Sequence, residues 1–442
     1  MTDDSVKQQI RTARGKFLAM AGTYSLGVFN DSFFREAAML LAVAANEEVM
    51  SNVIMSLFSL PYILFASYSG WLADRFSKRH VVIGAKVLEL VAMIMGAIGI
   101  ITGSYPFILT MVFLMAWQSC IFSPSLNGSI PELYPDVYVT KANARLKVAT
   151  TAAILGGIAV VGHVLVAEGT GWGGVPMGRL LVGICVVGIA ALGVLVSFGV
   201  PKRPAADAKA RFPWEGPWST IRQLTLIYRD RLLRMIVIVD LYIWFVGTLL
   251  VLIIKVLAMK QYGYDKDMAS SMMAVWVIGV AVGGLIGGAV AVGKRWFRYI
   301  PVCVLVMGLT FLAVGAIPWM SSTSLEVPAM LFWNAFAVPV QIVAIFVLLG
   351  VVAVFGGMVL IPCEAFVQRR PPAGRKGRVL ASAAFAVFSG ILVSGSLANL
   401  LAAPDAGGRS LVAPSRAMAL LGVAALAAGL FFRRAYAKET EA

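Results

Sequence analysis

Long apolar segments follow one another along the whole chain, each bounded by polar or basic residues. The hydrocarbon core of a bilayer is about 30 Å thick, so a helix of about 20 residues crosses it. The segments are continuous rather than alternating, and they therefore predict membrane-spanning helices and not the strands of a barrel. Twelve such segments lie near residues 16–44, 50–73, 81–102, 106–128, 144–167, 179–199, 231–259, 267–293, 297–318, 339–367, 377–402 and 413–433.

Composition also favours an all-α integral membrane protein. The chain is 60% hydrophobic and 13% charged, whereas soluble domains carry about 25% charged residues. Its N-terminus is polar and then basic, which predicts no removable signal peptide. The four cysteines lie in apolar segments without CxxC spacing, so we expect core residues rather than disulfides or a metal site. The stretch from Ser321 to Val340 is interrupted by Pro328 and Pro339 and is predicted to be an interfacial loop.

The basic residues predict the orientation in the membrane. With both termini cytoplasmic, five of the 37 Lys and Arg lie in outside loops and three within spans, which leaves 29 in cytoplasmic segments. This asymmetry follows the positive-inside rule. The net charge of +15 then reflects topology and anionic membrane lipid, and we expect no nucleic-acid binding because the chain has no soluble basic domain.

A charged, proline-rich linker divides the spans into two sets of six. The predicted domains are an N-terminal half at residues 1–200, a linker at 201–230 and a C-terminal half at 231–442. Trp214 and Trp218 in the linker predict a short helix at the level of the lipid headgroups. Two parallel six-helix halves with the substrate path between them are typical of secondary transporters.

Three ionisable residues interrupt the first span near its middle. Asp31 and Arg35 are four residues apart on one helical face, and Glu36 follows directly. Charge at this depth is costly, so such residues normally face a partner or a polar cavity. One interpretation is a self-neutralised pair buried between helices. We favour the other, a polar site inside a transporter, because eleven further spans can enclose a cavity.

The loop after the second span resembles motif A of the major facilitator superfamily. It reads GWLADRFSKR from Gly70 to Arg79, against the pattern G-x-L-a-D-r-x-G-r-k, and Ser77 replaces a glycine of that pattern. The resemblance implies twelve transmembrane helices in two pseudo-symmetric six-helix halves. It also implies that Asp74 contacts the N-terminal end of the eleventh span, near Arg378, where the helix dipole favours an anion.

Three further stretches resemble the bacterial lysophospholipid transporters, a branch of the same superfamily. They are Phe29 to Asp31 (FND), Phe122 to Leu133 (FSPSLNGSIPEL) and Ile361 to Arg370 (IPCEAFVQRR). The chain departs from that family at Leu126-Asn127, where Lys-Tyr is usual. The resemblance implies alternating-access transport of lysophospholipids from the outer to the inner leaflet of the bacterial inner membrane. It also implies a functional link to a lysophospholipid acyltransferase or acyl-carrier-protein synthetase, and we expect a monomer without cofactor or metal.

These motifs predict two sets of functional residues. Lysophosphatidylethanolamine carries a phosphate and an ammonium, so its site needs a cationic and an anionic partner. Asp31 and Glu36 are predicted to receive the ammonium and Arg35 or Lys255 the phosphate, although Lys255 can equally snorkel to the interface. The predicted substrate-binding residues are Asp31, Arg35, Glu36, Asp240, Lys255, Gln118 and Asn127. The predicted gating residues are Gly70, Asp74, Arg75, Arg79, Glu132, Glu364 and Arg378.

Two other patterns are assigned to packing. Lys86 and Glu89, three residues apart on the third span, are predicted to form a structural pair rather than a site. On the eighth span Gly279, Gly283 and Gly287 repeat every four residues, which predicts close helix packing. The family fold places this span beside the fifth.

One rival function comes from the same residues. A proton-coupled transporter of drugs or small solutes would use Asp31 as its proton carrier. An enzyme is not expected, because the chain holds no GxSxG, HExxH or GxxxxGK[ST] motif. Neither His80 nor His163 begins the His-x4-Asp pattern of an acyltransferase.

Overall fold

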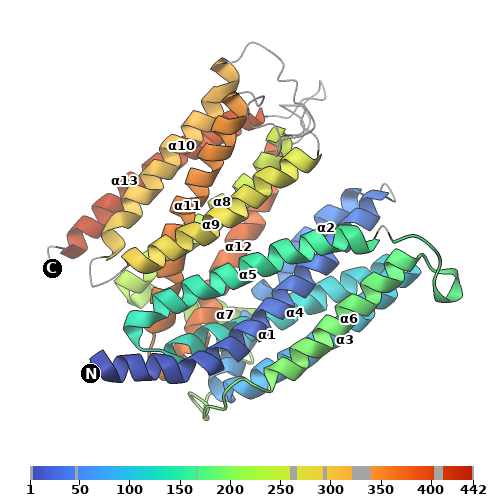
Figure 1. Ribbon diagram of the computed structural model, residues 1–442. Helices are drawn as coiled ribbons and strands as arrows, with labels where there is room; N and C mark the ends of the chain where they lie inside the picture. Colours follow the sequence, from blue (N-terminus) through green and yellow to red (C-terminus); the bar gives the residue numbers. More distant parts are fainter. Residues whose placement is uncertain are drawn as a thin grey trace. The chain divides into compact units, whose positions relative to one another are not determined.

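The computed structural model describes residues 3–44, 48–165, 167–258, 266–291, 296–320, 340–402 and 412–440 (Figure 1). These residues are almost entirely helical, with three short 3-10 helices and one isolated bridge between Thr170 and Pro176. The α-helices are α1 (Asp3–Ala44), α2 (Glu48–Arg75), α3 (Lys78–Thr102), α4 (Tyr105–Leu133), α5 (Asp136–Leu165), α6 (Met177–Ser197), α7 (Pro217–Arg229), α8 (Arg231–Val256), α9 (Lys266–Val290), α10 (Ile300–Met320), α11 (Val340–Arg369), α12 (Lys376–Ala402) and α13 (Pro414–Thr440).

The all-α fold is confirmed, and each of the twelve predicted spans coincides with one helix. The remaining helix, α7, confirms the short helix predicted in the linker. Among the described residues, α3 to α6 and α8 to α13 are the ten helices long and apolar enough to cross a membrane. Helix α1, which carries Asn30, Asp31 and Arg35, is not one of these ten. The loop predicted from Ser321 lies outside the described residues up to position 339.

Helix α1 begins well before the predicted start of the first span. It starts at Asp3 rather than near residue 16, because apolar side chains continue along one face of its first turns. Ala13 and Phe17 are buried in a core with Tyr134 and Val139, which lie at the α4–α5 connection. The first turns of α1 therefore pack on other parts of the protein, and the helix extends beyond the predicted membrane boundary.

The chain forms two compact units. One consists of Met1–Ile238 and Ala365–Ser389, and the other of Val239–Glu364 and Gly390–Ala442. The first unit thus includes the end of α11 and the beginning of α12 as well as α1 to α7. The predicted division at residues 200 and 230 stays a prediction.

Small residues let the helices of the first unit approach closely. Helix α5 runs along α1, and α3 packs against α4 and α6 (Figure 1). A Cβ atom on Gly157 would lie 2.7 Å from the carbonyl oxygen of Phe29, and one on Gly96 would lie 2.6 Å from the ring of Phe34. Lipid tails are as apolar as these side chains, so close van der Waals packing, and not exclusion of water, holds the helices together.

The glycine repeat of α9 packs against α11 in the second unit. A Cβ atom on Gly283 would overlap the carbonyl group of Val354, and one on Gly287 would lie 2.6 Å from the carbonyl oxygen of Met358. Gly357 of α11 approaches Val280 of α9 in return. Close packing of the repeat is therefore confirmed, with α11 as its partner inside the second unit. The predicted neighbourhood with the fifth span stays a prediction.

We expect Gly283→Ala to destabilise the protein, because the added methyl group meets backbone that cannot move aside. Overpacking of this kind costs about 1–3 kcal/mol. Gly395→Ala on α12 is the matched control, since nothing lies within 4 Å of a Cβ atom at that position. Thermal unfolding of the detergent-solubilised variants should show a lower midpoint for Gly283→Ala and an unchanged or higher one for Gly395→Ala. Equal midpoints would contradict the close crossing.

Candidate functional site

A buried charge cluster lies inside the first unit, where α1, α3 and α4 meet. Lys86 and Glu89 on α3 form an ion pair with Nζ 2.6 Å from Oε2, and both side chains are almost fully buried. Gln118 of α4 donates from Nε2 to the same Glu89 oxygen at 3.0 Å. The Lys86 ammonium also lies 5.4 Å from the centroid of the Phe122 ring. The pair predicted from sequence is thus confirmed, and it has a third polar member on another helix.

Asp31 belongs to this cluster. Its carboxylate interacts electrostatically with Glu89 first, then with Lys86 and with Arg35. The buried Oδ1 atom of Asp31 accepts no hydrogen bond from any described residue. Among the described side chains there is also no ion pair within 4 Å between Asp31 and Arg35. The self-neutralised pair that the helix spacing allowed is therefore not formed, and Asp31 lies among the charges of α3 as well as beside Arg35.

A glycine on α1 makes room for the cluster. A Cβ atom on Gly27 would lie 2.6 Å from Nζ of Lys86 and 3.3 Å from Oε2 of Glu89. Gly27 precedes Asp31 by four residues and so lies on the same face of α1. Sequence reasoning separated Lys86 and Glu89 from Asp31; this shared face was the signal that could have joined them.

The cluster has more acceptors than donors. Three buried oxygens find no hydrogen-bond donor within the described part of the chain: Oδ1 of Asp31, Oε1 of Glu89 and Oε1 of Gln118. When all groups are ionised, the carboxylates of Asp31 and Glu89 share the ammonium of Lys86, and Arg35 acts on Asp31 more weakly than Lys86 and without an ion pair. An uncompensated charge inside a membrane protein is costly. The arrangement is therefore suited to receive a group that brings positive charge and N–H or O–H donors.

The other predicted binding residues lie elsewhere. Arg35 and Glu36 are half-buried and follow Asp31 by about one turn of α1. Asp240 is buried on α8 in the second unit, where it interacts electrostatically with Glu364 of α11. Glu364, predicted as a gating residue, is thus placed beside a predicted binding residue. Lys255 lies in α8, but its side chain is outside the described part of the structure.

Asn127 belongs to a second polar network near the ends of α4, α5 and α11. It donates from Nδ2 to Oγ of Ser123 at 3.2 Å, and its Oδ1 lies 3.4 Å from Nε2 of Gln368. Gln368 and Asn143 also exchange two hydrogen bonds of 2.9 and 3.0 Å. Among the predicted binding residues, the structure therefore joins Asp31 with Gln118 and separates both from Asn127.

The contact predicted for Asp74 is present. Its carboxylate accepts hydrogen bonds from the backbone N–H groups of Gly377 at 2.7 Å and Arg378 at 3.1 Å, at the first turn of α12. The Arg378 side chain adds a 3.3 Å contact from Nε. Here the helix N-terminus supplies free N–H donors and partial positive charge. Gly70 allows the approach, because its Cβ atom would lie 2.9 Å from Cα of Arg378.

The linker adds a second carboxylate to this contact, which we call the latch: Asp74, Asp207, Gly377 and Arg378. Nη2 of Arg378 lies 3.3 Å from Oδ2 of Asp207. The backbone N–H of Asp207 donates to the carbonyl oxygen of Asp74 at 2.9 Å. Asp207 was missed from sequence, since a lone acid in a polar linker gives no signal of its partner.

Further ion pairs and hydrogen bonds tie the same ends of the first unit. Glu132 accepts from Lys78, and Arg79 donates to the carbonyl oxygen of Phe198 at 2.9 Å. The gating role of Glu132 and Arg79 stays a prediction. Arg370 contacts Asp230 at 2.7 Å, a pair not predicted from sequence. For Arg75, the described residues provide neither an ion pair nor a hydrogen bond.

Long apolar helices, a charge cluster around the first span and a latch at the start of α12 define a membrane transporter of the major facilitator type. The sequence matches the Major Facilitator Superfamily over residues 15–395, and the chain belongs to this superfamily. Members of the family are transporters rather than enzymes. The chain is thus a multi-pass membrane protein.

Individual proteins named lysophospholipid transporter are similar to this chain in sequence. The chain is 26% identical to the lysophospholipid transporter LplT of Photorhabdus laumondii over 354 residues, which cover 76% of this chain and 77% of that one. It is 27% identical to LplT of Klebsiella pneumoniae over 353 residues, covering 77% and 78% of the two chains.

Two solved structures share the fold. A bacterial homologue of the iron transporter ferroportin, in an outward-facing state, superposes with a TM-score of 0.70 at 13% identity, covering 97% of this chain and 100% of that one. The proton:xylose symporter XylE superposes with a TM-score of 0.68 at 13% identity, covering 95% of each chain.

We expect Asp74→Asn to open the latched ends of the first unit, because the amide loses the charge that the α12 N-terminus and Arg378 stabilise. Such couplings amount to about 1–3 kcal/mol, or about 5- to 150-fold in population. A single cysteine at the buried position Ser129, in a variant without native cysteines, would report opening by its rate of thiol labelling. Arg75→Gln, next in sequence and without a contact among the described residues, is the control. Equal labelling of Asp74→Asn and Arg75→Gln would contradict a latch.

The Asp230–Arg370 pair predicts a dependence of stability on pH. Partial burial raises the pKa of Asp230, but the bonds from Arg370 and from the backbone of Leu233 and Leu232 outweigh it and hold that pKa below its usual value of 3.8. The carboxylate therefore contributes stability that is present above pH 3.8 and is lost as the pH falls through the lowered pKa.

Asp230→Asn should accordingly lower the unfolding midpoint at neutral pH and have no effect in acid. The exposed pair Glu215–Arg222 supplies the control, because Glu215→Gln removes a solvated ion pair of little value. A difference between Asp230→Asn and the unmodified protein that persists unchanged in acid would refute the assignment.

Proposed function

We propose that the protein is a lysophospholipid transporter that moves lysophospholipids such as lysophosphatidylethanolamine from the outer to the inner leaflet of the bacterial inner membrane by alternating access. The observation that carries this proposal is the buried cluster of Asp31, Lys86, Glu89 and Gln118, with its excess acceptors. Similarity to the proteins named lysophospholipid transporter LplT supports the substrate class.

The chemistry of the cluster matches an ethanolamine headgroup. A primary ammonium brings one positive charge and three N–H donors. The cluster offers three oxygens without a donor among the described residues, and its two carboxylates share the single ammonium of Lys86. Arg35, one turn further along α1, is the cation that would meet the adjoining phosphate. Lys86 takes no part in binding the phosphate, because it neutralises Glu89.

The latch supports movement by alternating access. It holds the beginning of α12 to α2 and to the linker through groups that one protonation or one substitution can release. We place the latch on the cytoplasmic side together with both termini, in agreement with the distribution of basic residues. Delivery to the inner leaflet would provide substrate for a lysophospholipid acyltransferase or acyl-carrier-protein synthetase.

The rival function is proton-coupled transport of a drug or small solute. One observation favours it: a buried carboxylate oxygen of Asp31 lacks a donor among the described residues, and binding of a proton would remove the charge on that carboxylate. The two functions differ in their dependence on the proton gradient. Reconstituted protein without any acyltransferase should still move labelled lysophosphatidylethanolamine after an uncoupler is added. Loss of that transfer would favour the rival.

Asp31→Asn should weaken transport of lysophosphatidylethanolamine selectively. Loss of a charge-assisted contact costs about 1.5–3 kcal/mol, or about ten- to a hundredfold in affinity. Lysophosphatidylglycerol, which has no ammonium, should be transported by Asp31→Asn as well as by the unmodified protein, and Glu215→Gln serves as the control for both substrates. An equal loss for both headgroups would contradict ammonium recognition.

The double variant Asp31→Asn, Arg35→Gln distinguishes binding from folding. If these residues only support the fold, removing both charges restores folding and transport together. If they bind the headgroup, the double variant is well folded but does not transport lysophosphatidylethanolamine. Size-exclusion profiles and thermal unfolding establish folding before transport is measured. Full transport by a well-folded double variant would overturn the assigned role.

A further inference from the structure

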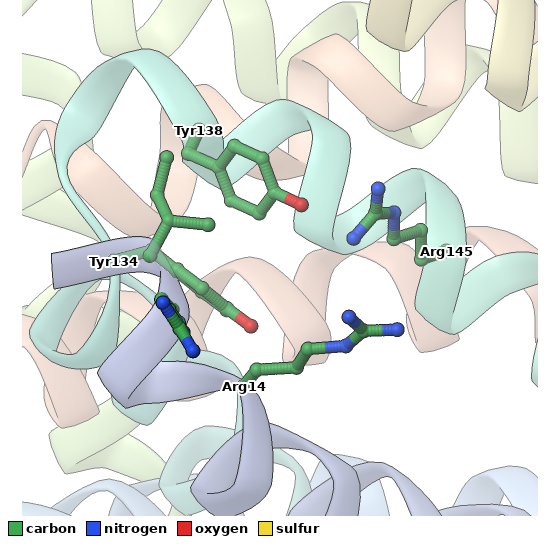
Figure 2. A pocket seen from close by; sticks show the side chains of 6 residues that line it. Arg14, Tyr134, Tyr138 and Arg145 are labelled. Carbon is green, nitrogen blue, oxygen red and sulfur yellow. The ribbon is translucent and has the colours of Figure 1, made fainter. Parts of the chain in front are cut away.

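An arginine-lined cavity opens at the other end of α1, away from the charge cluster. It has a volume of about 400 Å³ and is lined by Ile10, Arg11, Arg14, Tyr134, Tyr138 and Arg145. These residues come from the first turns of α1, the α4–α5 connection and α5. Figure 2 shows Arg14, Arg145 and the two tyrosine hydroxyl groups bordering one opening.

The cavity is strongly cationic. Three of its six lining residues are arginines, and no Asp or Glu is among the described residues that line it. None of these three guanidinium groups forms an ion pair with a described carboxylate. Like charges gathered around one opening repel each other, and an anion placed between them removes that cost. Arginine is the side chain best suited to bind phosphate, because its planar fork donates two parallel hydrogen bonds.

The aromatic residues of the cavity pack on one another and on Arg145. The Arg145 guanidinium lies 5.4 Å from the centroid of the Tyr138 ring, and the rings of Tyr138 and Tyr134 are 4.8 Å apart. Tyr134 packs edge-on against Phe17 at 5.3 Å and is almost fully buried. Burial and the neighbouring Tyr138 raise the pKa of Tyr134, despite the opposing effect of Arg145 and Arg14. Its hydroxyl therefore stays protonated and is available as a donor.

From this geometry we propose that the cavity binds the phosphate headgroup of an anionic phospholipid of the cytoplasmic leaflet. The predicted first span begins near residue 16, so Arg11 and Arg14 lie at headgroup level by the orientation inferred above. The apolar floor of Ile10, Tyr134 and Tyr138 favours a lipid over a free phosphate ion, because it offers a surface for the glycerol and first acyl carbons. The bound lipid joins the first turns of α1 to the α4–α5 connection.

This site is distinct from the transported substrate's site in the proposed function and does not depend on it. The cluster around Asp31 accepts positive charge, whereas the cavity accepts negative charge. Removing the cavity arginines should therefore change lipid retention and stability, and these are measured without any transport assay.

Native mass spectrometry of the full-length protein in uncharged detergent provides the test. Phosphatidylglycerol is the anionic probe and phosphatidylcholine the zwitterionic one. The variant Arg14→Gln, Arg145→Gln should bind phosphatidylglycerol more weakly by about tenfold or more, with no change for phosphatidylcholine. The matched control is Arg433→Gln, Arg434→Gln, which removes the same charge from exposed positions of α13 outside the cavity lining and should retain the lipid. Equal retention by the cavity variant and the unmodified protein overturns the proposal.

Thermal unfolding separates the two sources of phosphate. Phosphatidylglycerol should raise the unfolding midpoint of the unmodified protein and leave that of the cavity variant unchanged, because a ligand stabilises the state that binds it. Inorganic phosphate should have little effect and should not displace the lipid; displacement would show a site for free anions and overturn the lipid assignment. If the double variant does not fold, the single variants Arg14→Gln and Arg145→Gln provide the test. Each should retain the lipid several-fold more weakly than the unmodified protein. Unchanged retention in both would refute the site.

Discussion

Charge buried between membrane helices is the constraint on which the rest of this structure depends. Lys86 and Glu89 neutralise each other on α3, and Gln118 completes the pair from α4. Asp31 is an additional buried carboxylate, and its Oδ1 atom accepts no hydrogen bond from a described residue. Replacing such groups by apolar ones is often neutral or stabilising for a fold, so their presence in the first unit agrees with the ligand-binding role proposed above. Gly27 contributes to this arrangement, because the absence of a side chain lets α1 approach Lys86 and Glu89 of α3, and this brings Asp31 close to their charges.

The latch follows a different physical rule. Asp74 is held by backbone N–H groups at a helix N-terminus, which are directional donors in a fixed position. Arg378 bridges this carboxylate to Asp207 of the linker, so that release of one contact weakens both. Each contact is modest by itself, which agrees with the opening that the proposed transport cycle requires. The buried cluster, by contrast, is made of strong contacts in a low-dielectric interior.

The sequence predicted the fold well because the signals for it are local. Twelve apolar segments and their lengths sufficed to place twelve helices, apart from the early start of α1, and motif A identified the contact of Asp74 with the start of α12. The candidate site was predicted only in part, because it depends on which helix faces meet. Asp31 was recognised by its depth in an apolar segment, whereas the partnership with Glu89 arises between helices that the sequence does not orient. The same limit explains why the packing of the α9 glycine repeat on α11 was not predicted and why Asn127 was grouped with Asp31. The cavity at the start of α1 was missed because α1 extends beyond the predicted membrane segment. The arginines of the cavity were used only to predict the orientation of the chain in the membrane.

The most direct test of the central claim is a structure of the protein bound to lysophosphatidylethanolamine in a lipid bilayer disc, determined by electron cryomicroscopy. The claim is that the excess acceptors of Asp31, Glu89 and Gln118 receive the headgroup ammonium. We predict density for the ethanolamine nitrogen at hydrogen-bonding distance, about 3 Å, from Asp31 and at least one of the other two residues. A headgroup resolved elsewhere, with the cluster unchanged from the arrangement described here, would contradict the account.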